Sequence, residues 1–301
     1  MSLNLAGVIP PVVTPFKDEE LDLDSLRANL RRLNGLGLSG YLVLGSNGEN
    51  VFLDQDESDR IIAAAREEVP PGKLLLAGTG AQSTRQTIAG TRRAAGLGAQ
   101  AALVFTPSYF KGQMNQDRLT AHYQRVAEES PIPILVYNVP ANTGLNMGPE
   151  LIARMAEHDN VIGVKDSSGN IGQLSEILRM VPEDFAVLVG NAPVFYPALT
   201  LGARGGILAV ANAAPEICLE IHDRVLAGDR KRALELQFLM TPLALMVTVR
   251  YGVGGLKAAM DLAGYSGGGV RSPLTLSRSP KVIAELKEEL KKIDSALGRA
   301  G

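Results

Sequence analysis

The chain contains a single cysteine, Cys218, among its 301 residues, so no disulfide bond can form within it. Scarce cysteine is typical of proteins in a reducing compartment. The chain also lacks an excess of positive charge: its net charge is −2, which argues against binding to nucleic acid or to an anionic membrane. It has no apolar run of about 18 residues, and its N-terminus lacks the charged region and the long apolar region of a signal peptide. We therefore expect a cytoplasmic protein with neither a nucleic acid nor a membrane as partner.

Histidine is scarce too. The three histidines, His122, His158 and His222, are scattered over segments that we predict to be helical, whereas a metal-dependent aldolase needs clustered ligands. The segment Gly35–Gly40 has the glycine spacing of a dinucleotide-binding loop. It follows a predicted helix and precedes a predicted strand, the reverse of the order that this loop requires. We expect no metal site and no nucleotide site.

Short apolar runs alternate with helical patterns through the first three quarters of the chain. The eight runs read as strands at Gly7–Thr14, Tyr41–Gly45, Lys73–Gly78, Ala101–Thr106, Ile132–Asn138, Val161–Lys165, Ala186–Gly190 and Gly206–Val210. Eight βα units in series predict an α/β fold, a closed (β/α)8 TIM barrel. An open, doubly wound sheet is the alternative.

Strand signals stop after about residue 226. The segments Asp229–Val247 and Leu256–Leu262 predict helices, and Ser279 caps a last helix with Pro280 at its first position. We expect a catalytic barrel over residues 1–226 and a C-terminal helical appendage over residues 227–301.

One predicted strand ends in a lone lysine, Lys165, followed at once by a polar turn. Burial of a lysine disfavours its charged form, and a neutral amine can attack a carbonyl to form a Schiff base. The alternative is a lysine that reaches solvent from the strand end. Of the other candidates, Lys17 lies among acidic residues, and Lys111 and Lys257 follow no apolar strand. Elimination favours Lys165 as the reactive amine.

Active groups of such barrels lie at the carboxyl ends of the strands. Tyr137 ends the strand before that of Lys165, so both should face one cavity, where a phenol can move protons to and from the amine. Ser46 and Asn47 lie in a glycine-bounded turn after the second strand and can hydrogen-bond a carboxylate. This set indicates a small-molecule 2-oxo acid as substrate. Glu49 could be a general base, but a carboxylate that ties down its own loop is the favoured interpretation.

Four motifs carry a family resemblance: GSNGE at 45–49, TPSY at 106–109, YNVPANTG at 137–144 and GVKDSSG at 163–169. In order and spacing they resemble the dihydrodipicolinate synthase/N-acetylneuraminate lyase superfamily. The resemblance implies a TIM barrel with a C-terminal helical domain, usually assembled as a homotetramer (a dimer of dimers). It also implies lysine-dependent lyase or aldolase chemistry on pyruvate or related 2-oxo acids, without a cofactor because the imine itself accepts the electrons.

The resemblance also assigns roles to individual residues. It implies that Lys165 forms the Schiff base, that Tyr137 shuttles protons, and that Ser46 relays them. It places Tyr109 across a dimer interface in the neighbouring site. Substrate contacts are implied for Ser46, Asn47, Asn142, Ser167 and Gly190.

Two departures bear on the substrate. Dihydrodipicolinate synthases have an arginine where this chain has Asn142, and a Thr-Thr pair where it has Ser46-Asn47. Both make the chain look more like 4-hydroxy-2-oxoglutarate aldolase, and we expect cleavage of that substrate to pyruvate and glyoxylate. The alternatives are a 4-hydroxy-tetrahydrodipicolinate synthase, which condenses pyruvate with aspartate semialdehyde, and a catalytically silent ligand-binding barrel.

Overall fold

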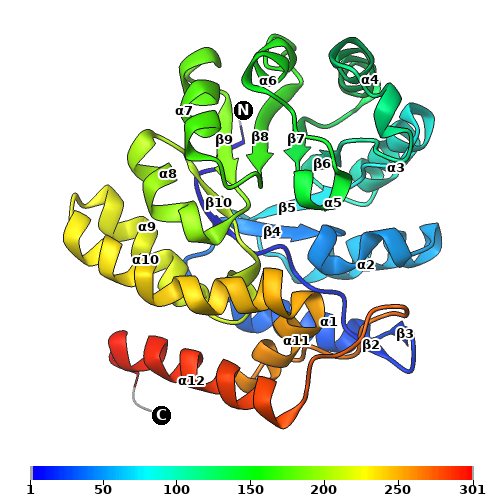
Figure 1. Cartoon of the computed structure of the whole chain (residues 1–301). Coiled ribbons are helices and arrows are strands. Elements are labelled where there is room, and N and C mark those ends of the chain that lie inside the picture. Colours follow the sequence, from blue (N-terminus) through cyan, green and yellow to red (C-terminus); the bar gives the residue numbers. More distant parts are fainter. Residues whose placement is uncertain (1–2, 300–301) are drawn as a thin grey trace.

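A computed structural model, which describes residues 3–299, shows a barrel of eight parallel strands surrounded by helices (Figure 1). The strands pair in the order β1-β10-β9-β8-β7-β6-β5-β4. Between β1 and β4 the ring is closed by hydrogen bonds, among them Val12 N to the Leu42 carbonyl at 2.9 Å and Leu42 N to the Pro10 carbonyl at 3.1 Å. The closed barrel is therefore confirmed. The barrel strands are β1 Gly7–Ile9, β4 Gly40–Val43, β5 Leu74–Gly78, β6 Ala101–Phe105, β7 Ile134–Asn138, β8 Val161–Asp166, β9 Ala186–Val189 and β10 Gly205–Ile207.

All eight predicted strands are present, but the first and last are shorter than expected. β1 gives way to Pro10 and Pro11, which have no N–H to donate, and the chain after β10 winds into a 3-10 helix. The sequence interpretation missed a short hairpin, β2 Phe16–Lys17 and β3 Glu20–Leu21. Its turn holds two non-glycine residues at positive φ, which apolar periodicity does not reveal.

Helices follow the strands on the outside of the barrel. They are α1 Leu23–Asn34, α2 Gln55–Glu68, α3 Thr84–Gly96, α4 Gln116–Glu129, α5 Pro140–Thr143, α6 Pro149–Met155, α7 Ile171–Met180, α8 Phe195–Leu201 and α9 Pro215–Leu226. Short 3-10 turns are η1 Ser46–Gly48, η2 Asn50–Phe52, η3 Lys111–Gln113, η4 Ala192–Val194 and η5 Ala209–Asn212. Side-chain caps fix several helix starts. Asp54 and Glu57 form a complete capping box at α2, because each side chain bonds the backbone of the other residue.

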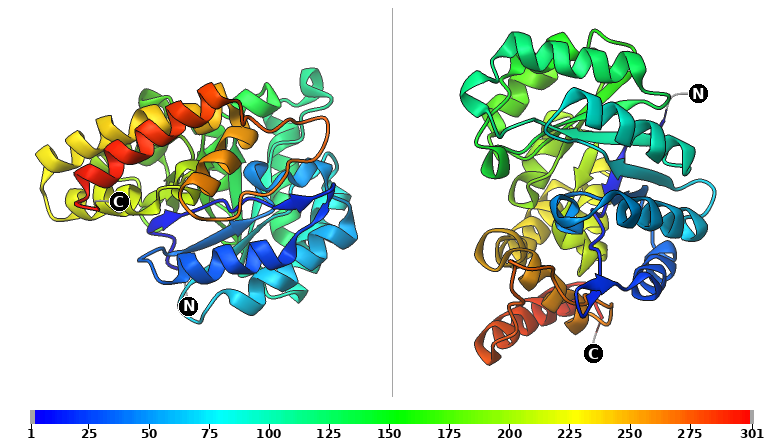
Figure 2. Two further views of the ribbon diagram at one scale, coloured as in Figure 1. Left: turned by 90° about the horizontal axis from the view of Figure 1, so that it is seen from below. Right: turned by 90° about the vertical axis from the view of Figure 1, so that its right-hand side faces the viewer.

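The C-terminal helices gather on one side of the barrel (Figure 2). They are α10 Arg230–Leu245, the π-helical turn η6 Met246–Arg250, α11 Gly252–Leu262 and α12 Pro280–Ala296. The Ser279 side chain accepts a hydrogen bond from the Val282 backbone and so begins α12 as predicted. The buried stripe of α12 includes Leu286 and Ile293, and each such side chain contributes about 1.5–3 kcal/mol to folding.

One continuous helix, Arg230–Arg250, is long and apolar enough by composition to cross a membrane. Its Leu236, Met240 and Leu243 are fully buried in the main core of the chain. Core helices of globular proteins meet the same criterion, so this helix is weak evidence for a membrane span.

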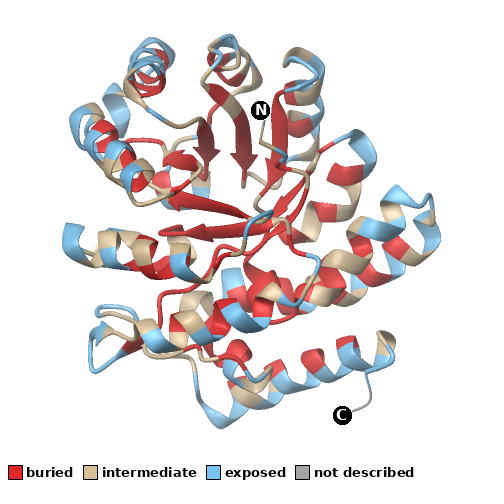
Figure 3. Cartoon of the chain, turned by 180° about the vertical axis from the view of Figure 1, so that it is seen from behind, coloured by how far each residue is buried: buried red, intermediate tan, exposed pale blue. Residues whose placement is uncertain are grey.

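Side chains alternate between two layers of the core, and most residues of the barrel strands are buried (Figure 3). On β7, Leu135 and Tyr137 belong to the cluster inside the barrel, whereas Ile134 and Val136 pack outward against the helices. This period of two is that of any strand. Because Tyr137 pairs in register with Lys165 on β8, both side chains belong to the inner layer at the carboxyl ends of their strands.

Candidate active site

Lys165 and Tyr137 lie together at the carboxyl end of the barrel. The Lys165 amine is 4.3 Å from the centre of the Tyr137 ring, and the two residues are only 4% and 6% exposed. The apolar run before Lys165 places its stem inside the barrel, as the sequence predicts. A buried amine beside a phenol can form an imine and exchange protons locally.

The surroundings of Tyr137 shift its acidity. Burial raises the pKa of the phenol, but the positive charge of Lys165 lowers it. Hydrogen bonding with Ser46, Ser167 and Lys165 acts in the same direction as that charge, and the pKa ends below its ordinary value. The structure therefore brings three other predicted site residues to the Tyr137 phenol, from the ends of β4 and β8.

The turn after β4 is held by a buried ion pair. Ser46 and Asn47 lie in η1 and are half-buried, and the turn ends at Glu49, whose backbone has φ 56°. Glu49 Oε1 lies 2.5 Å from the Lys257 amine, and both side chains are fully buried. Its other oxygen accepts a hydrogen bond from the Arg271 backbone at 2.8 Å. Glu49 thus ties down its own loop, as expected.

Sequence analysis excludes Lys257 as the reactive amine because no apolar strand precedes it. The structure shows that it is nevertheless a buried lysine. It lies on α11, and its amine donates to the Thr14 carbonyl at 2.7 Å and to the Gly269 carbonyl as well as to Glu49. Burial lowers the pKa of the Lys257 amine, and the Glu49 charge opposes this shift. With every donor position occupied, this second buried lysine fastens the Ser46–Asn47 loop to the C-terminal helices.

A polar network lies behind Lys165 and Tyr137, on the outward face of the same strands. Asn138 donates to Asp166 Oδ1 at 2.6 Å, and Ser168 donates to Asp166 Oδ2 at 2.6 Å. The Met147 backbone donates to Asn138 at 3.1 Å. Burial raises the pKa of Asp166, although these hydrogen bonds oppose it. Because Asn138 and Asp166 directly follow Tyr137 and Lys165, the network joins β7 and β8 at the level of the site.

Gly190, at the end of β9, leaves the space that the Lys165 side chain fills. A Cβ at this position would lie 1.9 Å from Ser167 Oγ and 2.8 Å from Lys165 Cε. We expect Gly190→Ala to displace the amine and to lower kcat about 100-fold, the effect of misplacing a reacting group by about 1 Å. Gly96→Ala is the control, because a Cβ there meets nothing within 4 Å. Steady-state kinetics with a melting curve checks both, and wild-type turnover in Gly190→Ala would contradict this role.

Two predicted residues are exposed, in contrast to Lys165 and Tyr137. Tyr109 is 80% exposed and packs edge-on against Phe110, with ring centres 5.0 Å apart. Gln82 pins this loop by accepting hydrogen bonds from the Ser108 and Tyr109 backbones. Asn142 is exposed on α5, immediately beyond β7. The single chain therefore does not bring Tyr109 into its own site.

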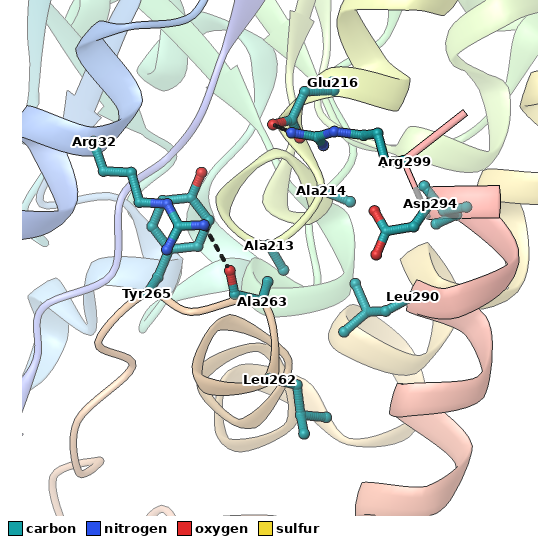
Figure 4. A pocket seen from close by; sticks show the side chains of 11 residues that line it. Arg32, Ala213, Ala214, Glu216, Leu262, Ala263, Tyr265, Leu290, Asp294 and Arg299 are labelled. Atoms are coloured by element: carbon teal, nitrogen blue, oxygen red, sulfur yellow. Dashed lines mark hydrogen bonds and ion pairs between the residues drawn. The ribbon is translucent and has the colours of Figure 1, made fainter. Parts of the chain in front are cut away.

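A different cavity, of about 210 Å³, lies between the barrel and the C-terminal helices (Figure 4). Its charged side chains serve mainly to join the two parts: Arg299 pairs with Glu216 at 2.7 Å, and Arg32 donates to the Ala263 carbonyl at 3.1 Å. Arg32 also stacks on the Tyr265 ring. Over residues 3–299, no group of three or more histidine, cysteine, aspartate or glutamate side chains is arranged to hold a metal ion.

Comparisons with known proteins agree over most of the chain. A profile of the Dihydrodipicolinate synthetase family matches residues 4–293. The chain is 36% identical over 296 residues to a 4-hydroxy-tetrahydrodipicolinate synthase of Methanothrix thermoacetophila, covering 97% of this chain and 98% of the relative. It is 38% identical over 273 residues to a Halobacterium salinarum protein named as an uncharacterized DapA-like lyase, covering 90% and 89% of the two chains.

Solved structures give the same result. Dihydrodipicolinate synthase from Thermotoga maritima superposes with a TM-score of 0.92 at 32% identity, over 96% of this chain and 99% of that one. A structure described as the first monomeric dihydrodipicolinate synthase variant gives a TM-score of 0.91 at 32% identity, over 96% and 97%. Sequence and fold thus match known proteins over about 96% of the chain.

Proposed function

The chain belongs to the Dihydrodipicolinate synthetase family, and from that premise we propose that Lys165 forms a Schiff base with pyruvate or a pyruvate-derived 2-oxo acid. The observation that carries the proposal is the Lys165 amine, buried in the barrel 4.3 Å from the centre of the Tyr137 ring. The enzyme is a lyase of this family. The roles of its residues and the identity of its second substrate are part of the proposal.

The chemistry proceeds in balanced steps. Lys165 gives its proton to the Tyr137 phenolate, and the neutral amine then attacks the C2 carbonyl; Tyr137 with Ser46 moves the protons that let the C2 oxygen leave as water. The resulting iminium accepts electrons. Loss of a proton from C3 gives an enamine, whose C3 attacks an aldehyde; run backwards, the C3–C4 bond breaks and the aldehyde departs. Hydrolysis of the imine releases the product and restores the amine. Ser46 and Asn47 hold the substrate carboxylate, with Ser167 and Gly190 beside the amine.

The names of the relatives favour synthesis over the cleavage that we expect from the sequence. Three relatives at 36–37% identity are named 4-hydroxy-tetrahydrodipicolinate synthases. We therefore propose condensation of pyruvate with aspartate semialdehyde as the main reaction. The aldolase remains a second candidate because Asn142 and the Ser46-Asn47 pair depart from the synthase pattern.

A substrate comparison separates the two candidates. Purified enzyme is given pyruvate with aspartate semialdehyde in one assay and 4-hydroxy-2-oxoglutarate in another, and kcat/KM is measured for each. We expect the condensation to be faster. A higher kcat/KM for the cleavage would assign the aldolase reaction, and no turnover with either would favour the silent barrel.

The lowered pKa of Tyr137 predicts a pH dependence. A phenol with a lowered pKa yields its phenolate below the pH at which free tyrosine ionises, so kcat should rise with pH through that lowered value. Tyr137→Phe should lower kcat by about 10²–10⁴-fold, the usual contribution of one acid–base group, and should remove this rise. A pH–rate profile of both proteins checks this. An unchanged rise in the variant would assign it to another group.

We propose that the enzyme assembles as a homotetramer in the cytoplasm, from protomers with a catalytic barrel at 1–226 and a helical domain at 227–301. Two separate exposed apolar surfaces support pairing by two different interfaces. Tyr109 and Phe110 form one beside the barrel mouth, and Phe238 and Val249 lie on the helix Arg230–Arg250. In this assembly Tyr109 reaches the neighbouring site.

Light scattering on the purified chain tests the assembly. The wild type should have the mass of four chains, and Phe238→Asp should reduce it to two by placing a charge in one interface. Loss of activity in Tyr109→Ala without loss of assembly would support a role for Tyr109 in the neighbouring site, across the other interface. A wild-type monomer would contradict the proposal.

A further inference from the structure

A groove on the outside of the barrel is separate from the Lys165 site. It runs between α3 and α4, which lie side by side (Figure 1), and has a volume of about 740 Å³. Ala89 on one helix and Ala121 on the other line its middle. Small-molecule sites have volumes of about 300–1,000 Å³, so the groove has room for a small metabolite.

The groove is strongly basic. Arg85 and Arg92 line it from α3, and Arg118 and Arg125 line it from α4, two helical turns apart on each helix. Glu129 is its one acidic lining residue. Both helices return from the mouth end of parallel strands, so their N-termini lie at the same end, where the positive ends of the helix dipoles add to the charge.

The two ends of the groove differ in how far their arginine charges are neutralised. At the C-terminal end, Glu129 accepts hydrogen bonds from Arg92 and Arg125, each at 2.9 Å. At the N-terminal end, Arg118 donates to the Gln113 carbonyl at 2.7 Å. The Arg85 side chain makes no hydrogen bond or ion pair with the part of the chain that the structure describes. The uncompensated positive charge is therefore at the N-terminal end.

A buried histidine lies in the wall at this same end. His122 is 7% exposed, and its Nδ1 is 2.9 Å from Thr84 Oγ1. Its Nε2 is buried and has no partner within residues 3–299. Burial lowers the pKa of His122 to about 4, so the ring is neutral near pH 7. When the Thr84 hydroxyl donates to Nδ1, the ring hydrogen is on Nε2, and a buried donor without an acceptor costs stability.

We propose that the N-terminal end of this groove, formed by Arg85, Arg118, Thr84 and His122, binds a multivalent oxyanion. Guanidinium groups bind phosphate and carboxylate oxygens in pairs, and with Thr84 donating to His122 Nδ1 the ring offers its Nε2 hydrogen as a further donor. The ligand is thus a small molecule that carries phosphate groups or several carboxylates. It binds on the outer face of the barrel, so the inference does not depend on the proposed substrate.

Titration calorimetry on the full chain in low-salt buffer tests the proposal, with pyrophosphate and citrate as separate probes. Saturable binding is expected for at least one, and its identity distinguishes phosphate from carboxylate recognition. Arg85→Ala/Arg118→Ala should weaken binding at least tenfold. Arg60→Ala/Arg230→Ala removes the same charge from exposed sites elsewhere and should leave the affinity unchanged.

Nitrogen NMR of labelled histidine gives a second readout, because the His122 Nε2 signal should shift as the anion binds. Saturable binding by neither probe would overturn the proposal. So would equal affinity in the two double variants.

Discussion

Lys165→Ala is expected to abolish turnover of every 2-oxo acid substrate. The loss should exceed the 10²–10⁴-fold that follows removal of one acid–base group, because the variant has no amine to form the covalent intermediate. Steady-state assay at high enzyme concentration measures it. The fold should survive, because the lysine lies at the end of its strand and the outward network of Asn138 and Asp166 stays intact.

Lys165→Arg is the matched control, since it keeps the positive charge beside Tyr137 without a usable nucleophile. We expect it to be as inactive as the alanine variant. Substantial turnover in either variant would show that the chemistry does not pass through this residue.

Lys257→Met is expected to destabilise the protein by about 3–5 kcal/mol, the usual loss when one partner of a buried ion pair is removed. The Glu49 carboxylate would then stay fully buried without its cation. Because Glu49 ends the turn that carries Ser46 and Asn47, the KM for pyruvate should rise in whatever protein remains folded. Urea unfolding and steady-state kinetics measure the two effects.

The double variant Glu49→Gln/Lys257→Met should recover much of the lost stability, because neither charge remains buried. As a surface control, Arg179→Ala removes an exposed partner of Glu176 and should leave the melting temperature nearly unchanged. An equal, small effect of Lys257→Met and Arg179→Ala would contradict the role assigned to the buried pair.

The architecture and the placement of Tyr137 beside Lys165 could be predicted from the sequence because both depend on local pattern. Parallel strands buried on both faces are continuous apolar runs, and eight of them imply the barrel. Tyr137 and Lys165 each end such a run on neighbouring strands, and their pairing in register follows. Asn138 and Asp166, one residue further, point outward by the same alternation, which could have indicated their joint network.

Contacts between distant segments could not be predicted in this way. The partner of Glu49 is Lys257, on a helix near the other end of the chain. The one available signal was a lysine within a small and apolar helical segment. Glycine is needed at position 190 because the Lys165 side chain from the adjacent strand lies against it. The apolar pattern of one strand gives no information about such a contact between strands.

The most direct test is reductive trapping. The enzyme is incubated with pyruvate and borohydride, digested, and its peptides are analysed by mass spectrometry. One stable pyruvate adduct on Lys165 is expected, with Lys257 unmodified because its amine is enclosed by Glu49 and two carbonyls. An unmodified Lys165, or an adduct on another lysine, would contradict the assignment of the reactive amine.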